Sequence, residues 1–220
     1  GVSAKADIIR EMCQDDHMVT RPEALTDLLR MNEKHEIICA AAIAQFSERG
    51  YTATSMANIA LAAGMSRPAL YQYFANKSDI FVSAFIAIFE EQVTNALRAL
   101  DQSQSMVDQL DGFLQRYEGD LWQRMAASPH TDEIIGAKNE RVGAAIGGEL
   151  GRLWDGMTTY LQEVAPGQDP SMTAARLGWL EILQLSPKGF RFDQPTVDGY
   201  RRRLTSLAKS VAADIEASTR

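Results

Sequence analysis

Apolar residues recur with a period of about 3.6 residues along most of the chain, which is the spacing of an amphipathic helix. Alternation of apolar and polar residues, which indicates a strand, lasts only a few residues wherever it occurs. Capping residues, glycines and prolines divide the pattern into segments. It predicts an all-α protein, with helices at residues 4–12, 22–30, 32–49, 55–63, 67–74, 77–100, 105–127, 132–138, 140–165, 171–185 and 195–218.

The stretch from Thr52 to Lys77 is the most informative part of this pattern. Ser55 is placed to cap one short helix and Gly64 to end it, since glycine tolerates the left-handed conformation at a helix C-terminus. Ser66 is placed to cap a second helix, with Pro68 in its first turn, where the missing N–H does no harm. Two short helices joined by a tight turn predict a helix-turn-helix, whose second helix enters the major groove of DNA.

The spacing sorts the side chains of this motif into an inward and an outward set. Met56, Ile59, Leu70 and Phe74 point inward and are predicted to be core. The outward set and the ends of the motif supply the candidate DNA-binding residues, which are Thr54, Ser55, Arg67, Pro68, Ala69, Tyr71, Gln72, Tyr73 and Lys77. Arg67 is the best single candidate for reading a base, since its planar fork matches O6 and N7 of guanine.

The other candidates carry groups suited to phosphates or to base edges. Thr54 and Ser55 lie where the first helix begins, so their hydroxyls and the exposed N–H groups suit a phosphate. Pro68 and Ala69 offer apolar contact to thymine methyl groups, and residues 71–73 offer hydroxyls and an amide. Tyr71 has an alternative role, since its ring can instead cover Leu70 and Phe74 of its own helix.

Charge is the feature that argues against a nucleic-acid partner. The chain has 22 Lys and Arg against 29 Asp and Glu, a net charge of −7. Between Met31 and Ser78 the balance is +1, from the bases Lys34, Arg49, Arg67 and Lys77 and the acids Glu33, Glu36 and Glu48, which leaves −8 for the rest. With so few cations, phosphate binding must depend on hydroxyls, amides and helix ends. We therefore predict a salt dependence no steeper than that of about 6–10 neutralised phosphates per dimer.

Cysteine content and hydropathy bear on the compartment. The two cysteines, Cys13 and Cys39, are too few for a disulfide scaffold in a chain of this length, so a reducing cytosol is expected. The longest apolar run, residues 80–89, is far short of the roughly 20 residues that a membrane span needs. Since no secretory signal pattern opens the sequence, we expect a cytoplasmic protein without a membrane partner.

Signatures of catalysis are missing from the sequence. It contains no G-x-S-x-G, P-loop, G-x-G-x-x-G, H-E-x-x-H or paired Cys-x-x-Cys motif. The histidines at 17, 35 and 130 are scattered, so spacing supports neither a metal site nor a catalytic triad. We therefore expect no catalytic residues, no metal and no cofactor, and predict that the protein is not an enzyme. A purely structural or interaction protein remains the second alternative.

Many positions of the motif agree in order and spacing with one known family. They are Gly50-Tyr51, Thr54-Ser55-Met56, Ile59-Ala60, Ala63-Gly64-Met65-Ser66, Leu70-Tyr71-x-Tyr73-Phe74 and Lys77. In these residues the chain resembles the TetR family of bacterial transcriptional regulators. The resemblance covers about residues 32–92 and argues against a different helix-turn-helix family. It also favours an electrostatic contact between Lys77 and the phosphate backbone of DNA. The alternative is that Lys77 is exposed to solvent at the start of its helix.

The resemblance implies a division into an N-terminal extension at 1–31, a DNA-binding domain at 32–92 with its motif at 55–74, and a ligand-binding and dimerisation domain at 93–220. It implies a homodimeric repressor that binds a double-stranded palindromic operator and is released by a small-molecule effector, mostly apolar. The alternative is a regulator that acts as an activator or through a protein partner, without a small-molecule inducer.

The second half of the chain supplies candidates for the effector site and the dimer interface. Aromatic residues that can line an effector cavity, or simply form core, are Phe113, Tyr117, Trp122, Trp154 and Tyr160. Glycines at 143, 147, 148 and 151 are expected to allow close helix packing. Segments 171–185 and 195–218 are expected to pair with their copies as a four-helix bundle, through Ala174, Leu177, Gly178, Leu180, Glu181, Leu204, Leu207, Ala208 and Val211.

Overall fold

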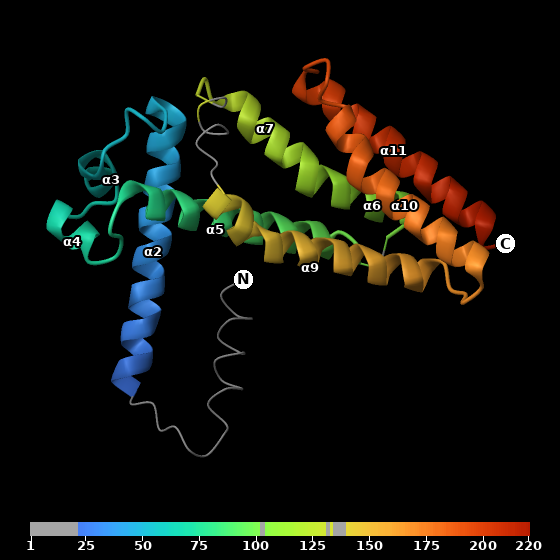
Figure 1. The fold of residues 1–220 in the computed structure, drawn as a ribbon, viewed down its shortest axis with the longest axis horizontal. Helices are drawn as coiled ribbons and strands as arrows, with labels where there is room; N and C mark the ends of the chain where they lie inside the picture. Colours follow the sequence, from blue (N-terminus) through green and yellow to red (C-terminus); the bar gives the residue numbers. More distant parts are fainter. Residues whose placement is uncertain (1–21, 102–103, 131–132, 134–139) are drawn as a thin grey trace.

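The computed structural model describes residues 22–101, 104–130, 133 and 140–220, and within these ranges it contains helices and connections but no strand. Figure 1 shows their arrangement. The helices are α2 (Pro22–Arg49), α3 (Met56–Ala62), α4 (Arg67–Tyr71), α5 (Lys77–Arg98), α6 (Met106–Leu114), the π-helical η1 (Gln115–Gly119), α7 (Asp120–Ala127), α9 (Glu140–Val164), α10 (Pro170–Gly189) and α11 (Val197–Ser218). The all-α prediction is confirmed. The helices predicted at 4–12 and 132–138 lie outside the described residues.

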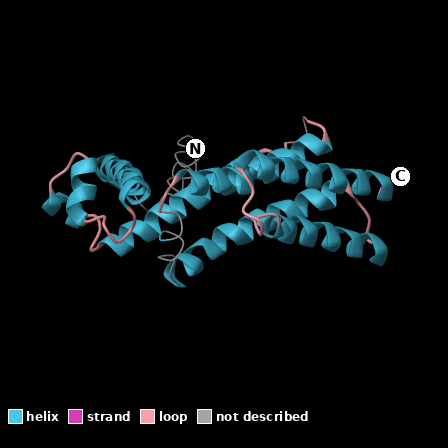
Figure 2. Cartoon of the chain, turned by 90° about the horizontal axis from the view of Figure 1, so that it is seen from above, coloured by secondary structure: helices cyan, strands magenta, loops and turns pink. Residues whose placement is uncertain are grey.

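Two hydrophobic clusters organise the described chain. The head core joins α2, α3, α4, the early turns of α5 and the first turns of α9. The body core joins the later turns of α5 with α6, η1, the later turns of α9, α10 and α11. Figures 1 and 2 show the short helices of the head at one end and the long helices of the body running away from it. The domain boundary predicted near residue 92 falls inside α5, between Phe89 of the head core and Val93 of the body core.

Helix α5 connects the two cores. It is long and apolar enough to cross a membrane by length and composition, the only such helix in the part of the chain that the structure describes. Both cores take residues from it, including Ile80 and Phe81 in the head and Val93 and Ala96 in the body. Its apolar character is therefore that of a core helix.

Local capping explains where several helices begin. Asn76 caps α5 by accepting a hydrogen bond from the Asp79 N–H. Ser105 caps α6 and Asp169 caps α10 in the same way. Each cap supplies an acceptor for one of the N–H groups that lack a partner in the first turn of a helix.

Three predicted helix boundaries are wrong. Helix α2 runs unbroken from Pro22 to Arg49, because no glycine or proline interrupts the chain near residue 31. Helix α10 continues past the break predicted at residues 186–189, with Pro187 buried inside it. The segment predicted as one helix at 105–127 contains the π-helical η1, whose residues Tyr117, Glu118 and Gly119 are all buried.

A buried polar cluster explains why α10 continues through its proline. The Tyr200 hydroxyl lies 3.1 Å from the Pro187 carbonyl oxygen and 3.1 Å from a carboxylate oxygen of Glu118. Arg191 donates to the Tyr200 hydroxyl and forms an ion pair with Glu118. Burial raises the pKa of Tyr200 to about 12. These hydrogen bonds and this ion pair connect the end of α10 to η1 and α11.

The glycines at 143, 147, 148 and 151 do not pack closely, so that expectation is wrong. A Cβ atom added at any of them would meet no described atom within 4 Å. The glycine of α9 that does pack is Gly156, where a Cβ would collide with Leu97 of α5. The other four lie on the side of α9 turned away from the cores.

Candidate DNA-binding site

Helices α3 and α4 form the helix-turn-helix that the sequence predicts. Ser55 caps α3 in a reciprocal arrangement, in which its side chain accepts from the Asn58 N–H and its own N–H donates to the Asn58 side chain. Gly64 has φ +67°, the left-handed conformation expected at the end of α3. Ser66 caps α4 through the Ala69 N–H at 3.3 Å. Leu70 is fully buried, so α4 is anchored in the head core.

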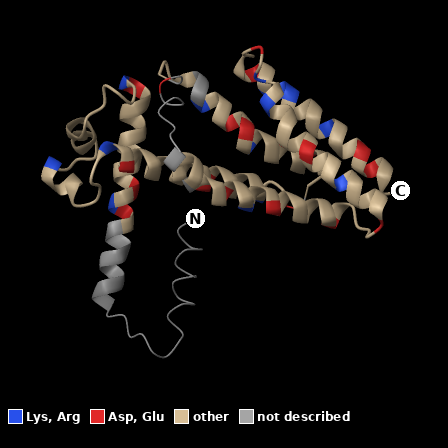
Figure 3. Ribbon diagram, viewed as in Figure 1, with Lys and Arg blue, Asp and Glu red and all other residues tan. Residues whose placement is uncertain are grey.

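The outer face of α4 presents the predicted contact residues. Arg67, Pro68, Tyr71 and Gln72 are exposed, and Ala69 is half-buried. Arg67 lies along Tyr71, with its guanidinium carbon 5.6 Å from the ring centre and Nη2 3.3 Å from the hydroxyl. Arg67 is the one charged residue of α3 and α4, and Figure 3 shows the charges of the described residues lying mostly on the longer helices. A guanidinium group and a phenol hydroxyl thus stand together on a motif that has no other charged residue.

Tyr73 belongs partly to the core. It is half-buried and packs edge-on against His35 of α2, with ring centres 5.5 Å apart. Phe74 packs on the same histidine at 4.9 Å. Helix α4 ends at Tyr71, three residues before the predicted end, so Tyr73 and Phe74 lie in the turn that closes the head.

The expectation that the Thr54 hydroxyl is available to a phosphate is wrong in this conformation. Thr54 is 1% exposed. Its hydroxyl lies 2.7 Å from the Gly50 carbonyl oxygen and 3.1 Å from that of Gln45. It therefore joins the end of α2 to the turn that follows it. Ser55 remains exposed at the start of α3.

The expectation that Lys77 points its charge outward is wrong as well. Its ammonium group donates to the carbonyl oxygens of Tyr51, Thr52 and Thr54 at 2.7, 3.3 and 2.8 Å. It also lies 4.4 Å from the centre of the Tyr51 ring. Burial lowers the pKa of Lys77, and the nearby Glu133 opposes that effect. All three N–H donors are used to hold the turn between α2 and α3.

Replacing Lys77 by methionine is expected to lower the free energy of unfolding by about 1–2 kcal/mol, because three carbonyls lose a charged donor while the aliphatic stem stays. Urea denaturation followed by circular dichroism measures this change. Lys34→Met, at an exposed position of α2, is the matched control. Equal stability of the two variants would contradict the role assigned to the ammonium group.

The predicted effector-site residues all belong to the body. Phe113 and Tyr117 pack edge-on against Trp154 at 6.0 and 6.1 Å between ring centres. Trp122 lies instead on the ring of Tyr200 at 5.4 Å. Tyr160 is buried and donates to the Gln109 side chain at 2.7 Å. All five thus belong to the body core or pack against it, and ring contacts join Phe113 and Tyr117 to Trp154.

Two buried polar groups in the body have no hydrogen-bond partner among the described residues. They are the side-chain amide of Gln92, which is 2% exposed, and the indole N–H of Trp122. Gln92 belongs to α5. Its spacing from Phe85, Phe89 and Ala96 puts it on the apolar stripe of α5, a signal that could have identified it. Buried polar groups are nearly always paired, so this amide requires an explanation.

Residues 38–84 match the model of the tetR family of bacterial regulatory proteins. The matched segment contains the whole helix-turn-helix and the start of α5, the part whose geometry is described above.

Residues 38–84 thus form a DNA-binding domain of the TetR type.

A segment of 75 residues, 34% of this chain, is 33% identical to the HTH-type transcriptional activator FasR of Mycolicibacterium smegmatis (strain ATCC 700084 / mc(2)155). The match spans only 32% of that relative's length.

Solved structures resemble a larger part of the fold. A putative TetR-family transcriptional regulator from Mesorhizobium loti MAFF303099 is 20% identical, with a TM-score of 0.61 over 84% of this chain and 98% of that one. The transcriptional regulator FadR from Bacillus subtilis, solved in complex with stearoyl-CoA, is also 20% identical, with a TM-score of 0.52 over 84% and 100%. These identities establish the shared fold alone. The family and these neighbours are transcriptional regulators, and none of them is named as an enzyme.

Proposed function

We propose that this protein is a TetR-family regulator and a homodimeric repressor that binds a palindromic operator and is released by a small, mostly apolar ligand. The observation that carries the proposal is the exposed outer face of α4 in a capped helix-turn-helix, with Arg67 at its tip. Ser55, Arg67, Pro68, Ala69, Tyr71, Gln72 and Tyr73 are its proposed DNA contacts. Thr54 and Lys77 act behind them by shaping the turn before α3.

The dimer proposal is supported by apolar side chains left on the surface of α10. Leu177 is 57% exposed and Leu185, eight residues later on the same helix, is 59% exposed. The α11 residues predicted for the interface are not available, because Leu204, Leu207, Ala208 and Val211 are buried in the body core of the same subunit. The proposed interface therefore uses Ala174, Leu177 and Glu181 of α10, with the outward face of α11 beside them.

The effector proposal is supported by the composition of the body core. A core rich in aromatic rings suits a mostly apolar molecule, and the unpaired Gln92 amide offers a polar group for it. The Bacillus subtilis neighbour was solved with stearoyl-CoA, whose acyl chain has this character. Stearoyl-CoA is therefore the first probe to test.

Activation is the second candidate for the sign of regulation. It is favoured by the name of the Mycolicibacterium relative, a transcriptional activator that is similar to this chain over 75 residues. A variant of the same proposal is action through a protein partner without a small-molecule effector. Activation and action through a protein partner both use the same DNA contacts of α4 as the proposed repressor. They differ from it in how DNA binding affects transcription.

Selection of bound sequences from random double-stranded DNA tests the function directly. We expect an inverted repeat whose half-sites lie about one helical turn, roughly 34 Å, or a multiple of it apart, as two-fold symmetry requires. Recovery of no inverted repeat would overturn the proposal. The effect on transcription of a reporter behind the selected sequence then separates repression from activation.

Salt dependence of operator binding is expected to be shallow. Lys77 is committed to three carbonyls, so Arg67 is the charged group left on the outer face of the motif. The logarithm of the affinity should fall with the logarithm of salt concentration less steeply than for about 6–10 neutralised phosphates per dimer. Fluorescence anisotropy between 50 and 300 mM salt, chosen as roughly spanning the physiological range, measures this slope. A steeper slope would show contacts from cations outside the motif.

Replacing Gln92 by leucine is expected to raise the free energy of unfolding by about 1–2 kcal/mol, because a buried amide without a partner is removed. Binding of an apolar effector should weaken in the same variant. Gln109→Leu is the matched control, since Gln109 is equally buried but pairs with Tyr160 and the Asp101 carbonyl. Urea denaturation should show opposite shifts for the two variants, and a loss of stability in both would contradict this interpretation.

A further inference from the structure

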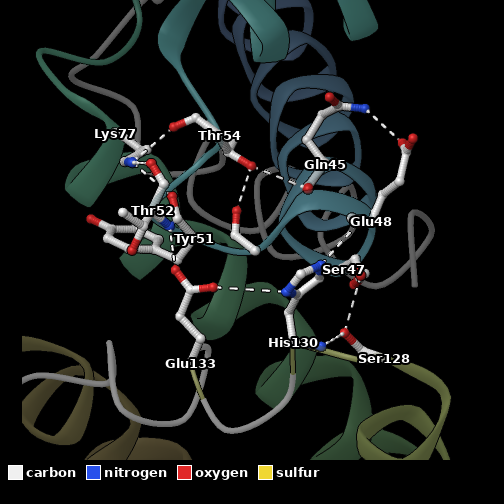
Figure 4. Close-up of polar contacts among 11 residues, drawn as sticks. Gln45, Ser47, Glu48, Tyr51, Thr52, Thr54, Lys77, Ser128, His130 and Glu133 are labelled. Carbon is white, nitrogen blue, oxygen red and sulfur yellow. Dashed lines mark hydrogen bonds and ion pairs between the residues drawn. The ribbon is translucent and has the colours of Figure 1, made fainter.

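The connection that follows α7 contacts the end of α2 in the head, as Figure 4 shows. The Ser128 hydroxyl donates to the Ser47 carbonyl oxygen at 3.1 Å. A ring nitrogen of His130 lies 3.2 Å from the Glu48 carbonyl oxygen. Since α2 ends at Arg49, these carbonyls belong to its last turn, where the helix itself offers no partner. A segment of the body thus caps a helix of the head.

Glu133 extends this contact to the turn between α2 and α3. Its carboxylate accepts a hydrogen bond from the backbone N–H of Thr52 at 2.5 Å and lies 3.9 Å from Nδ1 of His130. The hydrogen bond from Thr52 is the main cause that holds the pKa of Glu133 below its usual range, and the charges of His130 and Lys77 act in the same direction. Figure 4 shows Glu133 pointing at the turn while Lys77 approaches it from another side.

Gly50 adapts the turn to this contact. Its φ of +81° is a conformation that other residues rarely adopt, and an added Cβ would collide with the Glu133 carboxylate and lie 3.1 Å from His130. The turn is therefore shaped for close approach by Glu133. Three residues of the body, Ser128, His130 and Glu133, form what we call the latch.

The latch and α5 hold the same turn from two directions. Lys77, the first residue of α5, binds the carbonyls of residues 51, 52 and 54, while Glu133 binds the N–H of residue 52. The turn leads directly into the cap of α3 at Ser55. A change in the position of the latch therefore acts on the first helix of the DNA-binding motif without passing along α5.

We propose that Ser128, His130 and Glu133 form a positioning contact, through which displacement of α7 or α9 in the body reaches the turn before α3. The proposal rests on the proposed function for its consequence at DNA, whereas the contact itself can be tested without DNA or effector. It makes Glu133 a positioning residue, which acts through Thr52 and not by touching the operator.

The test compares the full-length protein with Glu133→Ala, Glu133→Gln and Asp155→Ala. All three tryptophans, at 122, 154 and 179, lie in the body, so their fluorescence during urea denaturation reports the body. Amide hydrogen exchange of residues 50–62 reports the turn and α3. Asp155 is an exposed carboxylate of α9 and controls for loss of charge.

We expect Glu133→Ala to speed exchange of residues 50–62 about fivefold while the fluorescence midpoint stays unchanged, because the hydrogen bond to Thr52 is lost locally. Glu133→Gln keeps an acceptor and should stay within about twofold of wild type. Unchanged exchange in Glu133→Ala, an equal loss of stability in the body, or glutamine behaving like alanine would each overturn the proposal.

The consequence for DNA is measured with a sequence recovered by selection. The Glu133→Ala variant should bind this DNA about fivefold more weakly than wild type. A head that is less restricted before binding loses more conformational entropy when it binds. Unchanged affinity would overturn transmission to the recognition helix. Failure to recover any operator would instead overturn the proposed function, and the exchange measurement would still decide the latch.

Discussion

Arg67→Ala should weaken operator binding by about 100-fold or more. A bidentate arginine–guanine pair contributes about 1–3 kcal/mol of discrimination, and a two-fold dimer loses one pair in each half-site. Arg67 is suited to this task because it stands exposed at the start of α4, on a motif with no other charge. Its contact with Tyr71 restricts the guanidinium before DNA arrives. The measurement is anisotropy on the selected operator at one fixed salt concentration.

Arg67→Lys separates base reading from simple attraction. Lysine keeps the charge but lacks the planar fork, so we expect most of the loss seen with alanine. Arg98→Ala, in the last turn of α5 and exposed, is the control for loss of a positive charge. Binding by Arg67→Ala within about threefold of wild type would contradict the assignment, since phosphate contact alone is weaker and independent of sequence.

Leu177→Glu should convert the dimer into monomers and reduce operator affinity at least 100-fold, on the order of the cost of burying unpaired charge. In a two-fold interface each substitution appears twice, so two carboxylates would face an apolar patch that includes Leu185. Light scattering after size-exclusion chromatography reports the mass, and anisotropy reports DNA binding. Ala144→Glu adds the same charge at an exposed site of α9 as a control. A dimeric Leu177→Glu, or a monomeric wild type, would contradict the proposed interface.

Local signals in the sequence were sufficient for the helix-turn-helix. Ser55, Gly64 and Ser66 act within three or four residues of their own positions, and the structure confirms each of them. Capping depends on neighbouring backbone groups, so it can be predicted without knowledge of the fold.

Contacts between distant segments could not be predicted in this way. Lys77 and Thr54 differ from surface residues only because the turn after α2 closes on the start of α5. The latch joins residues about 80 positions apart, and nothing in the spacing of His130 or Glu133 marks it. The tertiary structure decides where these polar groups find partners.

The apolar stripe of α11 shows a different limit. Leu204, Leu207 and Val211 have the period of a buried helix face, and the same period fits a subunit core or a dimer interface. The structure assigns them to the core of the subunit, which leaves α10 to offer apolar surface. A hydrophobic period predicts that a face is covered, and it does not say by which molecule.

The four exposed glycines of α9 lower the intrinsic helical stability of the segment that joins the head to the body. Glycine costs about 1 kcal/mol relative to alanine inside a helix, and residues 143, 147, 148 and 151 fall in the first half of α9. This half gains its stability from Val142 and Ile146, which are buried in the head core. We therefore expect the helical structure of this half of α9 to depend on its packing against the head.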